Sequence, residues 1–219
     1  MSQADNIRRG DIKRNEAEWL APVASARESS EDKERAAAER ARNPLLHITH
    51  HAFACRDAEE TQRFYEDILR MPLVAAVVLD DPFRDDHAPY CHFFFEMADG
   101  NCLAFFDHSD HFRPEDFEPK SGFHHHLAME VGSDETVQEY RARLSAAGIP
   151  NSYIDHGPYH SLYFIDPNGL NLEITFKAPG TREYENASRQ IARKTLDDWR
   201  LERQGVIASM RMRQANTAS

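Results

Sequence analysis

Short stretches of hydrophobic residues recur between residues 45 and 177, and polar turns separate them. Apolar, aromatic and β-branched residues dominate six strand-like stretches, which are 45–54, 72–79, 90–97, 101–106, 124–131 and 154–176. The last of these is split by the turn sequence Asp166-Pro167-Asn168-Gly169. Two other stretches, Asp57–Leu69 and Asp134–Ala147, begin at an acidic cap, and the first has apolar residues at helical spacing. The pattern therefore predicts an α+β fold.

The order strand-helix-strand-strand-strand occurs twice, which indicates an internal repeat. His51 and Tyr65 are fourteen positions apart, and so are His126 and Tyr140. One copy alone is too small to close a core, whereas two copies side by side can curve their sheets around a shared cavity. We therefore predict two paired βαβββ modules that form a curved mixed sheet around a metal site.

The repeat divides the chain into three parts. Residues 1–44 are predicted to be a helical N-terminal arm, and residues 178–219 a helical C-terminal arm. Residues 45–177 form the domain between them, with modules at 45–107 and 123–177.

Within the arms, the charged and alanine-rich segments Ile7–Leu20 and Ser30–Arg42 favour helices, and so does Glu183–Gln204. The alternative for the N-terminal arm is a disordered tail. We interpret the C-terminal helix as a packing or dimerisation arm and expect a homo-oligomer.

The negative charge is concentrated in the domain. The whole chain has a net charge of −11, whereas residues 1–44 are neutral and residues 178–219 carry +3, which leaves −14 for residues 45–177. Such a surface repels polyphosphate, so nucleic-acid binding is not expected. A bound metal ion can still supply positive charge locally for a small ligand.

The three cysteines, Cys55, Cys91 and Cys102, are an odd number without CxxC spacing, which indicates a reducing compartment and no disulfide framework. The N-terminal residues lack the apolar segment of a signal peptide, and no apolar run approaches the length of a transmembrane helix. We therefore expect a cytoplasmic protein without membrane association.

The two modules differ at the position where a carboxylate ligand is expected. Four residues after the turn glycine of the second module stands Glu173, inside an otherwise apolar strand. The same count from Gly100 in the first module gives Ala104. The chain thus offers one carboxylate and a histidine in each first strand. Two imidazoles and one carboxylate on one face of a metal leave the other positions open, an arrangement suited to Fe(II).

The register of the histidines is open from the residues alone. His47, His50 and His51 share one strand, and residues 124–126 are all histidine. The pairs His50/His125 and His51/His126 are equally offset, so the repeat does not choose between them. An isolated histidine in a strand is more often structural, but two histidines and Glu173 in matching places favour a site.

His51, six residues before Asp57, is followed by the run Arg63-Phe64-Tyr65. This pattern resembles the vicinal oxygen chelate superfamily, which has the paired βαβββ fold and includes glyoxalases, fosfomycin-resistance proteins and ring-cleaving dioxygenases. The resemblance covers residues 45–177. It implies His51, and through the repeat His126, as metal ligands.

A longer pattern resembles the signature of single-domain type I extradiol ring-cleavage dioxygenases. It comprises Ile154-x-His156, then Leu162-Tyr163, Asp166-Pro167-x-Gly169 and Glu173. The resemblance implies that Glu173 is an iron ligand and that His156 and Tyr163 contact substrate or oxygen. Many members of that family carry four modules, whereas this chain has two.

The same resemblance implies an acid–base histidine before the second metal-binding histidine. His111 is our candidate and His108 the alternate, although no motif fixes either. Four aromatic residues are candidates for an apolar pocket, although such residues in strands are more often core: Phe93, Phe95, Phe105 and Tyr159.

These observations predict an Fe(II)-dependent extradiol dioxygenase that cleaves the ring of a catechol-type aromatic diol with O2. Mn(II) is the alternative metal. The alternative functions are another metal-dependent enzyme of the same superfamily, namely an isomerase, an epoxide-opening transferase or a hydrolase, or a non-catalytic protein that binds a small aromatic compound.

Overall fold

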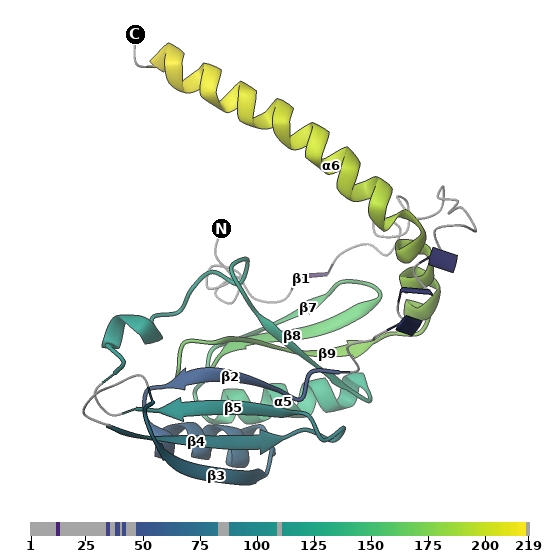
Figure 1. Cartoon of the computed structure of the whole chain (residues 1–219). Coiled ribbons are helices and arrows are strands. Elements are labelled where there is room, and N and C mark those ends of the chain that lie inside the picture. Colours follow the sequence, from purple (N-terminus) through teal and green to yellow (C-terminus); the bar gives the residue numbers. More distant parts are fainter. Residues whose placement is uncertain are drawn as a thin grey trace. The chain divides into compact units, whose positions relative to one another are not determined.

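The computed structural model describes residues 12–13, 34–35, 38–39, 41–42, 47–82, 88–108 and 111–217, and it describes side chains between residues 34 and 206 within these ranges. The chain forms two compact units (Figure 1). The first unit, here called the body, comprises Met1–Arg14 and Leu45–Ala178, and the second comprises Asn15–Pro44 and Pro179–Ser219.

The body contains two β-sheets. The first-module sheet consists, in spatial order, of β2 (His50–Cys55), β5 (Cys102–Asp107), β4 (Pro89–Glu96) and β3 (Leu73–Asp80). The second-module sheet consists of β1 (Ile12–Lys13), β7 (Asn151–Asp155), β8 (Tyr159–Ile165), β9 (Asn171–Lys177) and β6 (Leu127–Val131). Apart from β1, both sheets have the same strand order, so the predicted α+β fold of two βαβββ modules is confirmed.

Each module packs its helix against one face of its own sheet. In the first module, α4 (Ala58–Gln62) continues directly into the π-helix η1 (Arg63–Ile68). In the second module, α5 (Asp134–Ala146) contributes the buried Val137 and Leu144. The short 3-10 helix η2 (Pro114–Phe117) lies in the connector between the modules.

Strand alternation separates a helix face from an open face in each sheet. On the helix face of the second-module sheet, Leu162, Leu172 and Ile174 are almost fully buried. Burial of each such side chain contributes roughly 1.5–3 kcal/mol. Residues at the intervening positions face the opposite way, and we call that side the open face.

Three of the four aromatic residues predicted to line a pocket belong to the core instead. Phe93, Phe95 and Phe105 are 4%, 0% and 0% exposed and lie on the helix face. The ring of Tyr65 from η1 stacks on Phe95, with 5.1 Å between the ring centroids. The alternative reading of these residues as core is therefore the correct one, because alternation along β4 and β5 directs them toward the helix. Tyr159, the fourth candidate, lies in β8 of the other sheet.

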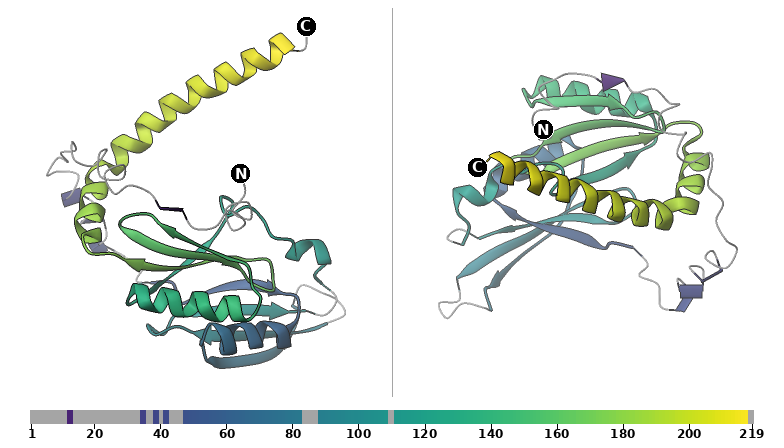
Figure 2. Two further views of the ribbon diagram at one scale, coloured as in Figure 1. Left: turned by 180° about the vertical axis from the view of Figure 1, so that it is seen from behind. Right: turned by 90° about the horizontal axis from the view of Figure 1, so that it is seen from above.

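Figure 2 shows, from behind, the helix of the first module next to α5 of the second. The Tyr140 hydroxyl donates to the carbonyl of Leu69 at 3.0 Å, and Arg143 Nη1 donates to the carbonyl of Ile68 at 3.2 Å. Side chains of α5 therefore satisfy carbonyl groups at the end of η1, where helical hydrogen bonding stops.

The turn between β8 and β9 makes a second connection between the modules. Asp166 is 4% exposed and accepts a hydrogen bond from the Tyr65 hydroxyl at 3.1 Å. Asn168 accepts from the backbone N–H of Arg56 at 2.8 Å and bonds the hydroxyl of Thr61. The polar turn of the second module is thus buried against the helix of the first.

The arms only partly match the sequence predictions. Most of Ile7–Leu20 lies outside the described residues, but Ile12 and Lys13 form a strand parallel to β7, so these two residues are not helical as predicted. Residues 34–35, 38–39 and 41–42 are helical. The C-terminal helix α6 spans Thr181–Thr217, longer at both ends than predicted.

The exposed surface of α6 carries several large apolar side chains and charged pairs. Among the described residues, no helix is both long enough and apolar enough to cross a membrane. The exposed apolar residues of α6 are Leu196, Trp199, Leu201 and Val206.

Gly169 and Gly100 provide a matched test of the contact between the β8–β9 turn and Phe117 in η2. Both have positive φ (79° and 81°), but a Cβ at Gly169 would lie 2.2 Å from the carbonyl oxygen of Phe117, whereas Gly100 has nothing within 4 Å. Gly100→Ala should therefore lower the free energy of unfolding only by the strain of positive φ, about 1–2 kcal/mol. Gly169→Ala should cost clearly more, as measured by urea denaturation. Equal losses in the two variants would contradict the close approach.

The Asp166 carboxyl gives a pH-dependent prediction. Burial raises the pKa of Asp166 to about 6 from an ordinary value of 3.8, so the folded protein favours its neutral form. The resulting stabilisation is complete below about pH 4 and is lost as the pH rises through 6. Relative to Asp166→Asn, the free energy of unfolding of the natural protein should fall by about 2 kcal/mol between pH 4 and 7. A pH-independent difference in urea denaturation would refute this assignment.

Candidate metal centre on the open face of the second module

The open face of the second-module sheet brings together some of the polar residues that the sequence singled out. Glu173 in β9 lies opposite Tyr163 in β8 and opposite Ala128 in β6. His126 precedes Ala128 by two positions and therefore points to the same face. The pleat thus places a carboxylate, a phenol and an imidazole on one side of the sheet.

Glu173 is only 8% exposed, and its two oxygens have different partners. The Ser161 hydroxyl donates to Glu173 Oε1 at 2.6 Å and in turn bonds the Thr175 hydroxyl at 3.0 Å. Because Ser161 uses its proton on Glu173, Thr175 is the donor in the second bond. Glu173 Oε2 faces His126 Nε2 at 3.4 Å. One oxygen is therefore held by hydroxyls and the other is directed at the imidazole.

The position of His126 suits a metal ligand. Its Nδ1 lies 3.0 Å from the carbonyl oxygen of Gly122, and because a carbonyl only accepts, Nδ1 carries the proton. In the neutral ring, Nε2 then has a lone pair that faces Glu173 Oε2, and either a proton or a cation is needed between them. Two ligands with metal bonds of about 2.1 Å are separated by about 3.0–3.4 Å, which matches this pair. The residues present therefore fit a divalent metal ion.

The side chains of His156 and Tyr163, both of which the sequence singled out, contact each other. His156 follows β7, and its Nε2 lies 3.0 Å from the Tyr163 hydroxyl, with the two rings nearly perpendicular at 88°. Because Tyr163 lies opposite Glu173 in the ladder, the pair is adjacent to the carboxylate.

The first strand of the first module differs from the prediction. His51 stacks on Phe53 with 4.3 Å between centroids, on the face whose side chains enter the core. His50 points to the open face and makes edge contacts with the rings of His92 and Phe94. His51 therefore does not occupy the position equivalent to His126.

Strand register identifies the residue of the first module that is equivalent to His126. In each module the first strand pairs with the last, and Ala52 opposite Ala104 corresponds to Ala128 opposite Glu173. His50 precedes the first pair by two positions, just as His126 precedes the second. His50, rather than the predicted His51, therefore occupies the position equivalent to His126.

The physical reason for this difference in register is the π-helix η1. The buried residues Thr61 and Leu69 are eight positions apart, whereas the buried Val137 and Leu144 in α5 are seven apart. A π-turn adds one residue relative to an α-helix. The fourteen-residue count from Tyr65 back to the first strand therefore ends one position too late, at His51, whereas the same count from Tyr140 ends at His126. A shift of one position along a strand moves a side chain to the opposite face of the sheet.

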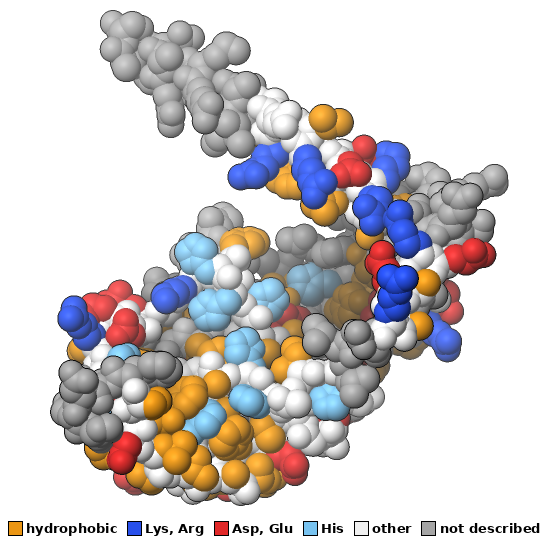
Figure 3. Space-filling model, viewed as in Figure 1, with side chains coloured by type: hydrophobic (Ala, Val, Ile, Leu, Met, Phe, Trp, Pro, Cys, Tyr) orange, Lys and Arg blue, Asp and Glu red, His pale blue; other side chains and the backbone are white. Residues whose placement is uncertain are grey.

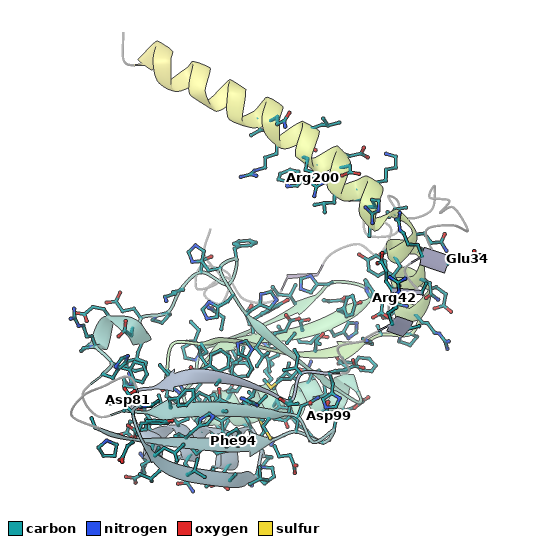
Figure 4. All side chains as sticks on the ribbon, in the orientation of Figure 1. Glu34, Arg42, Asp81, Phe94, Asp99 and Arg200 are labelled. Carbon is teal, nitrogen blue, oxygen red and sulfur yellow. The ribbon has the colours of Figure 1, made fainter. Side chains whose placement is uncertain are left out.

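His111 and His108, the predicted acid–base candidates, group with Asp81. Ligand atoms of these three residues lie within 4.8 Å of one another, and no other such trio of histidine, cysteine or acidic residues occurs in the described ranges. Figure 4 labels Asp81 and Asp99 at opposite ends of the first-module sheet, and Asp99 lies at the end where β2 begins. The structure thus does not bring these histidines into a ligand cluster with Glu173.

Histidine side chains cluster in the space-filling view (Figure 3). Burial is the largest cause that lowers the pKa of His125, and positive charge on Lys120, His124, His126 and His51 lowers it further. Histidines of β2 and of the segment before β6 therefore both lower the pKa of His125. The sequence did not single out Ser161, whose only signal was a hydroxyl residue two positions before Tyr163.

Comparison with known families agrees with this architecture. The family model of the Glyoxalase/Bleomycin resistance protein/Dioxygenase superfamily matches residues 47–174, and the chain belongs to this superfamily. No curated protein matches the chain.

The chain is similar to several solved structures. A glyoxylase/bleomycin resistance protein/dioxygenase domain from Frankia sp. EAN1pec is 17% identical, with a TM-score of 0.50 over 61% of this chain and 99% of that chain. A genomically encoded fosfomycin resistance protein, FosX, from Listeria monocytogenes is 20% identical, with a TM-score of 0.46 over 63% and 98%. A glyoxalase/dioxygenase from Nostoc punctiforme is 22% identical, with a TM-score of 0.46 over 61% and 92%.

Proposed function

We propose that this protein is an Fe(II)-dependent extradiol dioxygenase that cleaves the ring of a catechol-type aromatic with O2. The observation that supports the proposal is the arrangement on the open face of the second module. A buried carboxylate faces an imidazole at 3.4 Å, and the His156–Tyr163 pair lies beside them. This combines a metal-ligand pair with a group that can hold and move a proton.

His126 and Glu173 would hold the metal. When bound, a divalent ion acts as a Lewis acid that lowers the pKa of a coordinated hydroxyl, and Fe(II) additionally permits chemistry with O2. The His126 side chain is 47% exposed, which leaves access for a substrate. Ser161 keeps Glu173 Oε1 occupied, so that Oε2 remains directed at the metal position.

The His156–Tyr163 pair would handle protons. A catechol must lose hydroxyl protons before ring cleavage, and the open-chain product regains one, so a donor and acceptor near the substrate is needed. The 3.0 Å contact lets a proton reside on either the phenol oxygen of Tyr163 or Nε2 of His156. Both side chains are partly buried, which limits exchange of that proton with solvent.

An aromatic surface on the open face of the first module supports a flat aromatic substrate. His92 and Phe106 stack with 3.9 Å between centroids and 7° between planes, and Phe94 packs beside His92 at 4.2 Å. These rings are partly exposed and lie on the same face as His50. Ring stacking and edge contacts of this kind favour aromatic ligands.

His50 is our candidate for the third metal ligand. Its Nδ1 contacts the Thr49 hydroxyl at 3.2 Å, which leaves Nε2 available. No described His, Cys, Asp or Glu joins His126 and Glu173 in a trio within 4.8 Å. We propose that a second copy of the chain supplies His50. Five large apolar residues of the edge strand β3 are 37–70% exposed, as expected of a strand covered by another subunit: Leu73, Val74, Val77, Val78 and Leu79.

Neighbouring histidines test the ligand assignment. His50→Ala should lower the affinity for Fe(II) or Mn(II) at least tenfold, because loss of one of three ligands removes a direct metal bond. His51→Ala should bind metal as the natural protein does, since its ring lies on Phe53. Metal content after anaerobic equilibrium dialysis distinguishes these outcomes. Equal losses in both variants, or a loss only in His51→Ala, would overturn the assignment.

Mixing variants tests where His50 comes from. His50→Ala and Glu173→Gln should each be deficient alone. Co-refolded together, they should regain part of the metal binding, because one of the two shared sites in a mixed dimer keeps every ligand. Absence of recovery despite formation of the mixed dimer would show that each chain completes its own site.

Oxygen uptake tests the reaction. Protein loaded anaerobically with Fe(II) should consume O2 with a member of a catechol panel and form a yellow ring-fission product. Tyr163→Phe should reduce kcat about 10²–10⁴-fold with unchanged iron content, because it removes a proton-transfer group. Tyr153→Phe is the matched control, since the Tyr153 hydroxyl bonds Asp134 instead.

Two other results would contradict the proposed reaction. Iron-loaded, folded protein that consumes no O2 with any catechol would refute ring cleavage. Metal-dependent turnover without O2 would favour the isomerase, transferase or hydrolase chemistry found in the same superfamily.

A further inference from the structure

We propose that Asp81, His108 and His111 form a second metal site, which binds Zn²⁺ at one end of the first-module sheet. Their ligand atoms lie within 4.8 Å of one another. This cluster is separate from His126 and Glu173, and the proposal does not depend on the dioxygenase activity.

Sheet topology explains why these residues meet. Strands β3 and β5 both run antiparallel to β4, which lies between them. They therefore run in the same direction, and their C-terminal ends lie at the same end of the sheet. Asp81 follows β3 directly, and its backbone N–H donates to the carbonyl of Ala88 just before β4. His108 follows β5 directly. The two side chains therefore approach one another across the beginning of β4.

The geometry of the pair already matches co-ligands of a metal ion. His108 Nε2 and Asp81 Oδ2 are 3.3 Å apart, close to the separation of about 3.4 Å for two ligands of tetrahedral zinc with bonds of about 2.1 Å. Both residues are 8% exposed. The ring of Tyr90 lies nearly parallel to that of His108, with 6.2 Å between centroids and 11° between planes.

His111 supplies the third ligand from the exposed side. The chain turns back after β5, so that the backbone N–H of His111 lies 3.3 Å from the carbonyl of His108. The two imidazole rings are 5.2 Å apart. Because His111 is exposed, it can move toward a metal at little cost, and a water molecule can complete the coordination.

The donor set defines the class of ion. Two imidazoles and one carboxylate suit a first-row divalent ion, and zinc accepts this set with four-coordinate geometry. A buried carboxylate beside a buried imidazole also favours a cation between them. Bound zinc would join the ends of β3 and β5 to the connector between the modules.

This cluster lies far from the beginning of β2. His50 is opposite Cys102, and His108 is six positions further along the same strand direction. At about 3.3 Å per residue, this places His108 about 20 Å from the level of His50. Loading of the two proposed sites can therefore be measured separately.

The alternative is a buried pair of Asp81 and His108 that binds no metal. That pair does not require His111, so the exposed histidine discriminates between the two. The test uses Glu173→Gln, which removes the carboxylate of the other site, and zinc chloride alone as the probe. Zinc content is measured after equilibrium dialysis, and the melting temperature is followed in parallel.

The Glu173→Gln protein should bind one zinc ion per chain at the Asp81 cluster, with a rise in melting temperature. Adding His111→Ala should weaken zinc binding at least tenfold and abolish that rise, whereas adding the exposed-histidine control His124→Ala should change neither. Asp81→Asn, which preserves shape, should behave like His111→Ala. The proposal is overturned if Glu173→Gln binds no zinc, or if zinc binding survives both His111→Ala and Asp81→Asn.

Discussion

The fold depends on a buried polar turn that joins the two modules. Asp166 Oδ1 accepts the backbone N–H groups of Asn168 and Leu170, while Oδ2 accepts the Tyr65 hydroxyl of the first module. A buried carboxyl is costly unless donors surround it, and here the donors come from its own turn and from the neighbouring helix. The same carboxyl group therefore both connects the two modules and fixes where β8 ends and β9 begins.

That constraint reaches the candidate metal centre through strand register. With the turn fixed, Tyr163 lies opposite Glu173, and both point to the open face. A slip of one residue would turn Glu173 toward α5 and bring Leu172 or Ile174 out of the core. Gly169 maintains the turn because its positive φ and its close approach to Phe117 exclude a side chain. The turn that connects the two modules thus also determines the geometry of the site.

Residues near this turn could be predicted from the sequence, whereas the first strand could not. The turn chemistry, the strand flanks and the apolar surroundings of Glu173 are local features, and His126, His156 and Tyr163 lie on the elements next to it. The choice between His50 and His51 depended on helix geometry, because the first-module helix holds one more residue than its counterpart α5 over the same length. No local sequence pattern indicates the extra residue in η1. The clustering of His108 and His111 with Asp81 was equally hidden, since it arises from strand ends that are distant in sequence.

The two modules carry different side chains at equivalent positions of their sheets. At equivalent positions the first module has Ala104 and Phe94 where the second has Glu173 and Tyr163. The alanine and phenylalanine stabilise the sheet through packing, but a nearly buried glutamate does not: its desolvation cost is only partly offset by Ser161, and an apolar residue of similar size would be as stable or more so. Stability alone therefore gives no reason for a carboxylate at position 173. A cation bound between Glu173 and His126 would give such a reason, because it would compensate the carboxylate charge and also bind the lone pair on His126 Nε2.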